Sequence, residues 1–344
     1  MRILLSSVGR RPYLVRWFRD ALKANGVDGA VLAADVDAHA PSRPFADGFV
    51  SAPRVVDPGY ASWLRQTLVE HDIDLAVSIN DFELSTWATL PEDRAWAPLV
   101  RLDADAQRLV EDKFATSQAL VKAGVPSPVT WLGTAPPAVE EAAGPFVTKG
   151  RYGSASRGLR FVDRAGLPGA LEEASGEVTT RQGVPALQQG EVPPAELIVI
   201  QERIDGVEYG LDVVCDLEGR YAGVLARRKI AMRSGETDRA VSVDAAPFES
   251  IARGIAEAIP HPGTIDVDVF VDASGDIYVI DINPRFGGGY PFSHMAGARV
   301  PECYVAWTLG REPDPAWLRC RPDVVAGKFV EIAATSEGGT GAVA

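Results

Sequence analysis

The sequence of 344 residues has little cysteine and histidine, and it lacks a long apolar run. Its three cysteines (Cys215, Cys303 and Cys320) are widely spaced and form no CxxC pair, which argues against a disulfide framework and a thiolate zinc site. We therefore expect reduced thiols in a cytoplasmic protein. The four histidines show no HExxH spacing. No stretch approaches the roughly 18 apolar residues of a membrane span, so no membrane partner is expected.

Clusters of basic residues are also missing. The chain has 34 Lys and Arg against 47 Asp and Glu, a formal net charge of −13. Neutralising the phosphates of a nucleic acid needs clustered Lys and Arg, so we expect no nucleic-acid partner. In the N-terminal segment MRILLSSVGRR the arginine pair follows the apolar run, which is the wrong order for a secretory signal. We interpret this segment as the first strand of a domain.

The first hundred residues alternate between strand-like and helix-like patterns. Buried-strand patterns cover 3–8, 30–34 and 75–79, and apolar residues at helical spacing cover 13–24, 60–70 and 84–88. This alternation predicts parallel βαβ units in an open, doubly wound sheet. Ligands of such sheets bind beyond the carboxyl ends of the strands. The loops 6–11, 34–43 and 80–83 would lie there.

The rest of the chain is richer in strands. Residues 103–123 indicate one or two helices, ended by Gly124 and the prolines that follow. Strand patterns dominate from 196 to 281, with one helix over 247–258. Residues 176–195 are polar and rich in Gly and Pro, which predicts a long mobile loop. The low-complexity tail SEGGTGAVA is expected to be disordered.

The first motif with a chemical meaning is FVTKGRYGSASRG, residues 146–158. A strand ends at Lys149, and glycines and serines follow within nine positions. Glycine lets the backbone approach a phosphate closely, and lysine supplies a positive charge. The spacing matches neither the P-loop nor the dinucleotide fingerprint. A phosphate-binding loop and an ordinary hairpin turn are both compatible with it.

The second motif is VIQERIDGVEYGLDV, residues 199–213. An apolar strand is broken by polar residues and the Gly206 turn before Glu208 begins another strand. Such a break frees backbone groups to pair with a flat heteroaromatic ring. The Glu208 carboxylate can accept hydrogen bonds from two ribose hydroxyls. A β-hairpin with a solvated glutamate is the alternative.

The third motif, TIDVDVFVDASGDIYVIDINPRFGGG (264–289), predicts two strands joined by an ASGD turn. Antiparallel pairing places Asp268 near Asp281, and Asn283 shares the Asp281 face. Facing carboxylates inside a sheet are costly unless a cation lies between them, and oxygen ligands suit magnesium. Asp266 is a weaker candidate ligand. A solvent-facing acidic hairpin is the alternative, against which the apolar IYVID segment argues.

Two further residues follow this hairpin. Arg285 lies two positions after Asn283, and its guanidinium can hold a carboxylate or a phosphoryl group in transfer. His294, in GGGYPFSH, is expected to have a structural or substrate-contacting role rather than a catalytic one. No Ser-His-Asp or Cys-His arrangement can be argued from the chain.

Taken in this order, the motifs resemble the ATP-grasp superfamily, and its carbamoyl-phosphate-synthase-like members in particular. The resemblance covers nearly the whole chain. It implies an α/β and α+β protein, in which an N-terminal Rossmann-like parallel sheet precedes a two-lobed ATP-grasp fold. The expected segments are 1–102 for the pre-ATP-grasp domain, 103–198 for the linker helices and small lid lobe, 199–330 for the large lobe with the metal site, and 331–344 for the tail.

The resemblance also implies roles for individual residues. The ligands it implies are ATP and Mg²⁺, with Mn²⁺ as a substitute. Lys113 and Lys149 would reach the phosphates under the lid loop Gly153–Gly158, and Arg285 would steady the acyl phosphate. Arg285 and Lys149 are the expected catalytic residues. The full expected set is Lys113, Lys149, Gly153, Ser154, Ser156, Gly158, Gln201, Glu202, Ile204, Glu208 and Lys229 for the nucleotide, and Asp268, Asp281 and Asn283 for the metal.

The sequence departs from the family pattern in three ways. Gly150 follows the lid lysine where the family often has proline, and Asp281 stands where many members carry glutamate. The chain has neither a second ATP-grasp half nor an amidotransferase module, which argues against synthesis of carbamoyl phosphate itself.

The expected reaction is phosphorylation of a carboxylate by ATP and attack of an amine on the acyl phosphate, with positioning and charge neutralisation as the main contributions of the protein. The candidate substrate contacts are Arg10, Arg11, Asp81, Glu83, Gly288 and His294. Three alternatives stay open: a carboxylase or formate-activating enzyme of the same fold, a nicotinamide oxidoreductase based on the first domain alone, and a nucleotide-binding module without catalysis. A homodimer is compatible with the sequence, but no motif predicts it.

Overall fold

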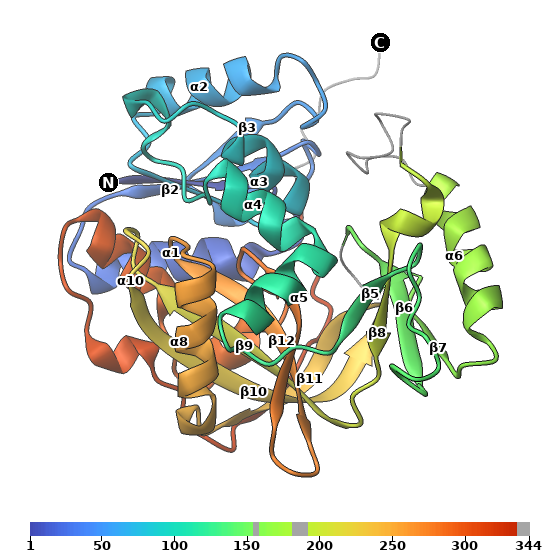
Figure 1. The fold of residues 1–344 in the computed structure, drawn as a ribbon. Helices are drawn as coiled ribbons and strands as arrows, with labels where there is room; N and C mark the ends of the chain where they lie inside the picture. Colours follow the sequence, from blue (N-terminus) through green and yellow to red (C-terminus); the bar gives the residue numbers. More distant parts are fainter. Residues whose placement is uncertain (154–157, 181–191, 336–344) are drawn as a thin grey trace.

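A computed structural model describes residues 1–153, 158–180 and 192–335 of the protein (Figure 1). The strands in these residues form three sheets: a four-stranded parallel sheet at the N-terminus, a four-stranded antiparallel sheet and a six-stranded antiparallel sheet. No helix within the described ranges is both long and apolar enough to cross a membrane. The mixed α/β architecture expected from the sequence is confirmed.

The N-terminal sheet has the strand order β3-β2-β1-β4, and all neighbours are parallel. Side chains alternate between its faces: Ile3 packs against Phe18 of one helix, whereas Leu4 packs against Trp87 on the other face. The sheet is thus covered on both sides (Figure 1). The elements are β1 (Arg2–Ser6), α1 (Pro12–Ala24), β2 (Ala30–Asp35), β3 (Gly48–Ser51), α2 (Tyr60–Glu70), β4 (Leu75–Ser78) and α3 (Asp81–Ala88).

Two linker helices lead from this domain to the small antiparallel sheet, whose order is β5-β8-β6-β7. The helices separate at Asp112, whose side chain accepts hydrogen bonds from the first N–H groups of the second helix. The elements are α4 (Ala104–Glu111), α5 (Lys113–Lys122), β5 (Thr130–Leu132), β6 (Phe146–Gly150), β7 (Arg160–Val162), α6 (Leu167–Thr180) and β8 (Ile198–Glu202).

One expectation for this region was wrong in part. Residues 176–195 were predicted to be a loop, but α6 continues to Thr180. The residues Ala170, Ala174 and Val178, at helical spacing, are buried and hold the helix in place. Residues 181–191 and the tail 336–344, predicted to be mobile and disordered, lie outside the described residues.

The large sheet has the order β13-β12-β9-β10-β11-β14. Its apolar face packs on α8 and α5 around Val213, Ile255 and Val267. A second core joins α1 to the C-terminal helices through Phe18, Phe286 and Tyr304, so the N-terminal domain and the large lobe share buried surface. The elements are β9 (Gly206–Cys215), β10 (Tyr221–Arg233), β11 (Glu236–Val243), α8 (Glu249–Ala258), β12 (Thr264–Asp272), β13 (Ile277–Asn283), α9 (Tyr290–Met295), α10 (Val300–Thr308) and β14 (Val325–Gly327).

Candidate active site

A pair of carboxylates lies on the hairpin formed by β12 and β13. Asp268 is directly opposite Asp281, and Asp266 is opposite Asn283. The Asn283 amide donates to the Asp281 carboxylate at 3.4 Å. The proximity of Asp268 and Asp281 expected from the sequence is therefore observed, and the hairpin collects four oxygen-bearing side chains on one face.

Each carboxylate has a lysine partner. Lys113 Nζ is 2.7 Å from Asp281 Oδ1, and Lys229 Nζ is 2.7 Å from Asp268 Oδ1. Burial opposes ionisation of Asp281, but Lys113 and Lys149 together outweigh it and lower its pKa. Burial raises the pKa of Asp268 to about 6, since Lys229 alone does not compensate for it. The two facing carboxyls thus have opposite pKa shifts.

Lys149 reaches this hairpin from the small lobe. Its ammonium group donates to the backbone oxygen of Ile280 at 3.1 Å, and the residue is only 7% exposed. Burial is the main cause that lowers its pKa to about 8; Asp281 opposes this shift and the nearby charge of Lys113 assists it. The two lobes are therefore in contact through a side chain that was predicted to bind phosphate.

The segment after Lys149 is anchored to the start of α5. Arg151 pairs with Asp112 at 2.6 Å, and the Lys113 N–H donates to the Arg151 backbone oxygen at 3.0 Å. This contact brings the two predicted phosphate lysines together. Gly153 and Gly158 have φ angles of +102° and +70°, which are accessible mainly to glycine. Ser154 and Ser156 lie outside the described residues.

The predicted adenine-binding segment connects the two antiparallel sheets. β8 ends at Glu202 and β9 begins at Gly206, so the intervening residues, Ile204 among them, join the small lobe to the large one. The Gln201 side chain is buried and donates to Thr130 Oγ1 at 3.0 Å, whereas Glu202 is exposed. A cavity of about 10 Å³ is lined in part by Lys113, Gln201 and Asp281.

Glu208 lies on β9, where it was expected to bind ribose. Its carboxylate is 2.6 Å from Lys229 Nζ, so one lysine bridges Glu208 and Asp268. Burial lowers the pKa of Lys229, but the two carboxylates outweigh this effect and raise it. Lys229, Glu208 and Asp268 form one charged network on the face of the hairpin.

Arg285 connects the hairpin to the N-terminal domain. Its Nε is 2.7 Å from Asp81 Oδ1, and its Nη2 lies 3.4 Å from Asn283 Oδ1. Burial lowers the pKa of Arg285, but Asp81 outweighs this and raises it. Asp81 opens α3 at the carboxyl edge of the parallel sheet. The structure therefore brings Arg285 and the substrate candidate Asp81 together.

Glu83 has a different environment from the one expected of a substrate contact. It is 2% exposed, and its carboxylate accepts hydrogen bonds from Ser6 Oγ, Tyr60 Oη and Ser78 Oγ at 2.7, 2.6 and 2.5 Å. Three hydroxyl groups satisfy this buried carboxylate. Glu83 thus joins β1, β4 and α2 through these hydroxyl groups.

The other substrate candidates are divided between the surface and the domain interface. Arg10 is exposed, and Arg11 lies at the start of α1, beside Glu236 and near Gly288. His294 is 8% exposed, stacks on Trp17 at 3.8 Å between centroids and lies 3.1 Å from Tyr290 Oη. These contacts join α1 to α9, and the role expected for His294 stays a prediction.

A buried charged network packs against Gly287 and Gly289, and it was not expected from the sequence. Arg227 is 1% exposed and is 2.6 Å from both Asp212 and Asp266. A Cβ atom on Gly289 would lie 2.1 Å from Arg227 Nη2, and one on Gly287 would lie 2.0 Å from Asp266 Cγ. The glycines are thus required by the side chains packed against them. The sequence signal that could have revealed this network is Arg227 itself, a basic residue at an inward-facing position of the apolar strand β10.

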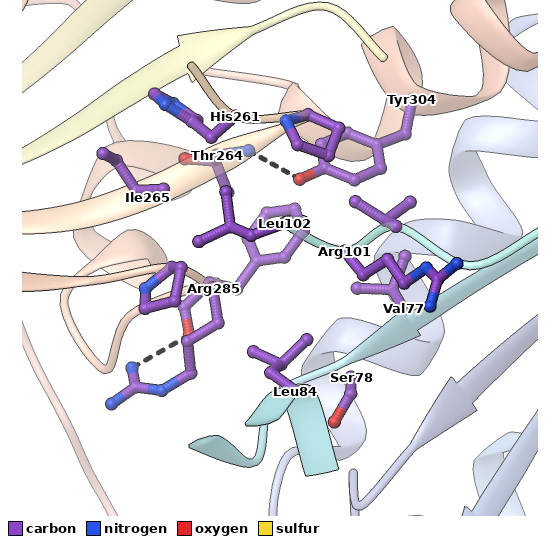
Figure 2. A pocket seen from close by; sticks show the side chains of 14 residues that line it. Val77, Ser78, Leu84, Arg101, Leu102, His261, Thr264, Ile265, Arg285 and Tyr304 are labelled. Atoms are coloured by element: carbon purple, nitrogen blue, oxygen red, sulfur yellow. Dashed lines mark hydrogen bonds between the residues drawn. The ribbon is translucent and has the colours of Figure 1, made fainter. Parts of the chain in front are cut away.

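Figure 2 shows a second small cavity, where the end of β4 meets the large lobe. Val77, Leu84 and Leu102 line it from one side, and Thr264, Arg285 and Tyr304 from the other. The Tyr304 hydroxyl accepts a hydrogen bond from the Thr264 N–H at 2.7 Å. Its volume of about 10 Å³ has room for roughly one water molecule. It is too small for a substrate.

Comparison with known proteins agrees with this geometry. The ATP-grasp domain family matches residues 110–289, and the PylC-like N-terminal domain matches residues 3–95. The large chain of carbamoyl phosphate synthase from Streptomyces coelicolor is 25% identical over 236 residues, which cover 64% of this chain and 20% of the relative. The match thus spans about a fifth of that protein's length.

Solved structures show the same fold. Biotin carboxylase from Campylobacter jejuni, in a βγ-ATP complex, superposes with a TM-score of 0.71 at 19% identity, covering 93% of this chain and 73% of that one. L-amino acid ligase from Bacillus licheniformis superposes with a TM-score of 0.63 at 16% identity, and the match covers 93% of this chain and 77% of that one.

A fold with two lobes around a lysine- and carboxylate-rich hairpin defines a class of nucleotide-dependent enzymes. The family match covers more than half of the chain, and the protein belongs to the ATP-grasp family. The resemblance stated from the sequence, including its carbamoyl-phosphate-synthase-like character, is confirmed. The roles of individual residues stay predictions.

Proposed function

We propose that this protein is an ADP-forming ligase that phosphorylates a carboxylate with ATP and joins the acyl group to an amine. The observation that carries the proposal is the convergence of Lys113, Lys149 and Lys229 on the Asp268–Asp281 pair. Lysines and carboxylates in one buried site suit a phosphorylated ligand with its cation. Family membership and the fold support the same class.

The donor set fits magnesium. Mg²⁺ binds through one or two protein carboxylates, with waters and substrate phosphates completing its shell. Asp268, Asp281 and the amide of Asn283 would supply such a set. Among the described residues no group of three His, Cys, Asp or Glu is arranged for a metal. When bound, the cation neutralises phosphate charge.

The residues of the chain would then act by positioning. Lys149 and Lys113 would bind phosphate oxygens, and Glu208 the ribose hydroxyls. Arg285 would stabilise the carboxylate that accepts the γ-phosphoryl group. In the first step a carboxylate oxygen bonds to the γ-phosphorus and ADP leaves. In the second step the amine nitrogen bonds to the acyl carbon, inorganic phosphate leaves, and the nitrogen loses a proton.

A screen of carboxylate and amine pairs tests this proposal. ADP release is measured with Mg²⁺ and ATP, products are identified by mass spectrometry, and bicarbonate and formate are included as carboxylates. We expect amide formation with at least one pair, and loss of activity in Lys149→Ala and Asp281→Ala with the fold intact by circular dichroism. Asp276→Asn is the matched control because Asp276 lies in the exposed turn of the same hairpin. Full activity in either site variant contradicts the site, and ADP release with bicarbonate or formate but no amine contradicts the ligase.

A further inference from the structure

Three charged side chains from distant parts of the chain meet above Gly288. Arg11 comes from the start of α1, Glu236 begins β11, and Lys328 directly follows β14. Lys328 Nζ lies 2.8 Å from Glu236 Oε2, and Arg11 Nη2 lies 3.5 Å from Glu236 Oε1. A Cβ atom on Gly288 would be 3.1 Å from Glu236 Oε2 and 3.4 Å from Lys328 Nζ. We call these three side chains the charged triad.

The triad adjoins the proposed catalytic groups. Gly288 is three positions beyond Arg285. Burial raises the pKa of Glu236, but Lys328, Arg11 and Arg285 outweigh it and lower the pKa. Gly287, which lies between Arg285 and Gly288, packs against Asp266, and Asp266 pairs with Asn283 across the hairpin, so the triad lies next to the hairpin that carries the proposed metal ligands. A group bound at the triad would be close to the acyl group that Arg285 is proposed to hold.

The charges at this place oppose those of the whole protein. Within the triad, Arg11 and Lys328 provide two cations against the one anion Glu236. The chain as a whole has a formal net charge of −13. A local excess of positive charge attracts anions. A substrate that carries a carboxylate is therefore favoured at the triad over one that carries only an ammonium group.

The triad is also partly exposed to solvent, and a ligand could replace its ion pairs. The side chains of Arg11, Glu236 and Lys328 are 19%, 53% and 29% exposed. Partly exposed ion pairs are weak, so a ligand that supplies both a carboxylate and an ammonium group can replace them. Such a ligand would pair its carboxylate with Arg11 and Lys328 while its ammonium group takes their place at Glu236. No charge is then left without a partner.

We propose that Arg11, Glu236 and Lys328 form the subsite for an amino acid that is the amine substrate of the ligase. The inference rests on the proposed function. Arg11 and Lys328 bind the carboxylate of the amino acid, and Glu236 orients its amino group toward the acyl carbon held near Arg285. The ammonium group first loses one proton to solvent, because the cations around Glu236 make this carboxylate a weak base. The neutral nitrogen then bonds to the acyl carbon while the phosphate leaves, and its second proton also passes to solvent.

The test compares amino acids with the same molecules lacking one charged group. The wild-type protein is assayed for ADP release with the proteinogenic amino acids, with their carboxamides and with the corresponding decarboxylated amines. We expect turnover with amino acids and about tenfold or greater loss with either analogue, which is the scale of a lost hydrogen bond to a charged group. Turnover of the carboxamides or of the decarboxylated amines at the same rate as the amino acids would overturn the subsite.

Two variants locate the effect. Glu236→Gln and Lys328→Met are each expected to raise the KM for the amino acid about tenfold, with less than a twofold change in the KM for ATP. Arg16→Met with Glu331→Gln is the matched control, because this exposed pair also joins α1 to the C-terminal segment, at 3.8 Å. Urea unfolding checks that every variant is folded.

The outcomes separate the two proposals. If the wild-type protein ligates amino acids but both variants keep its KM values, the subsite is wrong and the ligase stands. If no pair releases ADP and no Mg²⁺-dependent nucleotide binding is found, both fall. Loss confined to the amino acid KM supports the subsite.

Discussion

The ammonium group of Lys113 lies 2.7 Å from the carboxylate of Asp281, although 168 residues separate the two in the chain. Lys113 begins α5 in the linker region, and Asp281 lies near the end of β13. The lysine contacts a carboxylate that is proposed to hold the metal ion. A cation and Lys113 therefore compete for the same carboxylate.

This competition leads to two opposite effects of one substitution. We predict that Lys113→Met binds Mn²⁺ more tightly in the absence of nucleotide, because Asp281 loses its counter-ion. The same variant is expected to bind ATP about tenfold more weakly, since a phosphate contact is lost. Mn²⁺ binding by electron paramagnetic resonance and nucleotide binding by calorimetry measure the two effects. Lys122→Met, on the exposed end of the same helix, is the control. Weaker Mn²⁺ binding in Lys113→Met would contradict the argument.

The second prediction concerns pH and the domain interface. Burial, assisted by Arg299, lowers the pKa of His294 to about 3, so the unfolded chain binds a proton below pH 6.5 that the folded chain does not. The folded state is therefore favoured above pH 6.5 and loses stability as the pH falls toward 3. Between pH 7 and pH 5 we expect the wild-type protein to lose about 1–2 kcal/mol more unfolding free energy than His294→Gln. Urea denaturation at both pH values measures this difference. Parallel losses in the two proteins would show that His294 protonates in the fold.

The third prediction concerns the buried network around Arg227. In Arg227→Met the carboxylates of Asp212 and Asp266 lose their cation while they remain in the interior. Breaking a buried ion pair from one side costs about 3–5 kcal/mol. Urea denaturation should show a loss of this size, whereas Arg228→Met, on the opposite face of β10, should change stability little. A stability close to that of the wild-type protein would mean that water replaces the guanidinium.

The fourth prediction compares two adjacent glycines. Gly289→Ala places a methyl group 2.1 Å from the buried Arg227 guanidinium, which cannot move away without leaving its carboxylates. Gly288→Ala meets the side chain of Glu236 at 3.1 Å, which is partly exposed and can rotate. Overpacking a core costs about 1–3 kcal/mol, so we expect this loss for Gly289→Ala only. Thermal unfolding of both variants decides, and equal midpoints would contradict the packing argument.

Local patterns in the sequence were sufficient for much of the fold. The alternation in β1, α1 and β2 predicted a parallel sheet because the side-chain period changes with the element. The ASGD turn predicted the hairpin that brings Asp268 near Asp281, and a register shift between Asp268 and Val269 places the two directly opposite each other. The helix α6 was not predicted, because its Gly and Thr residues have low helix propensity, and the burial of Ala170, Ala174 and Val178 stabilises it.

Long-range contacts limited what could be predicted of the site. Nothing local in NDFE distinguishes Asp81, which pairs with Arg285, from Glu83, which is buried under three hydroxyls two positions later. Because the two residues lie on different sides of α3, Asp81 contacts Arg285 at the hairpin, whereas Glu83 contacts the strands of the parallel sheet. Glu236 and Lys328 were missed for the same reason: their ion pair joins segments 92 residues apart.

The hydrogen bond from Lys149 to the Ile280 backbone oxygen has a kinetic consequence. It closes the two lobes on each other by the same ammonium group that is proposed to bind phosphate. A nucleotide that binds here as proposed would have to replace this bond, so its observed association rate would depend on the fraction of molecules in which the bond is open. Ile280 contributes only its backbone oxygen to this hydrogen bond. A substitution of its side chain would therefore weaken the bond only by changing the geometry of the strand.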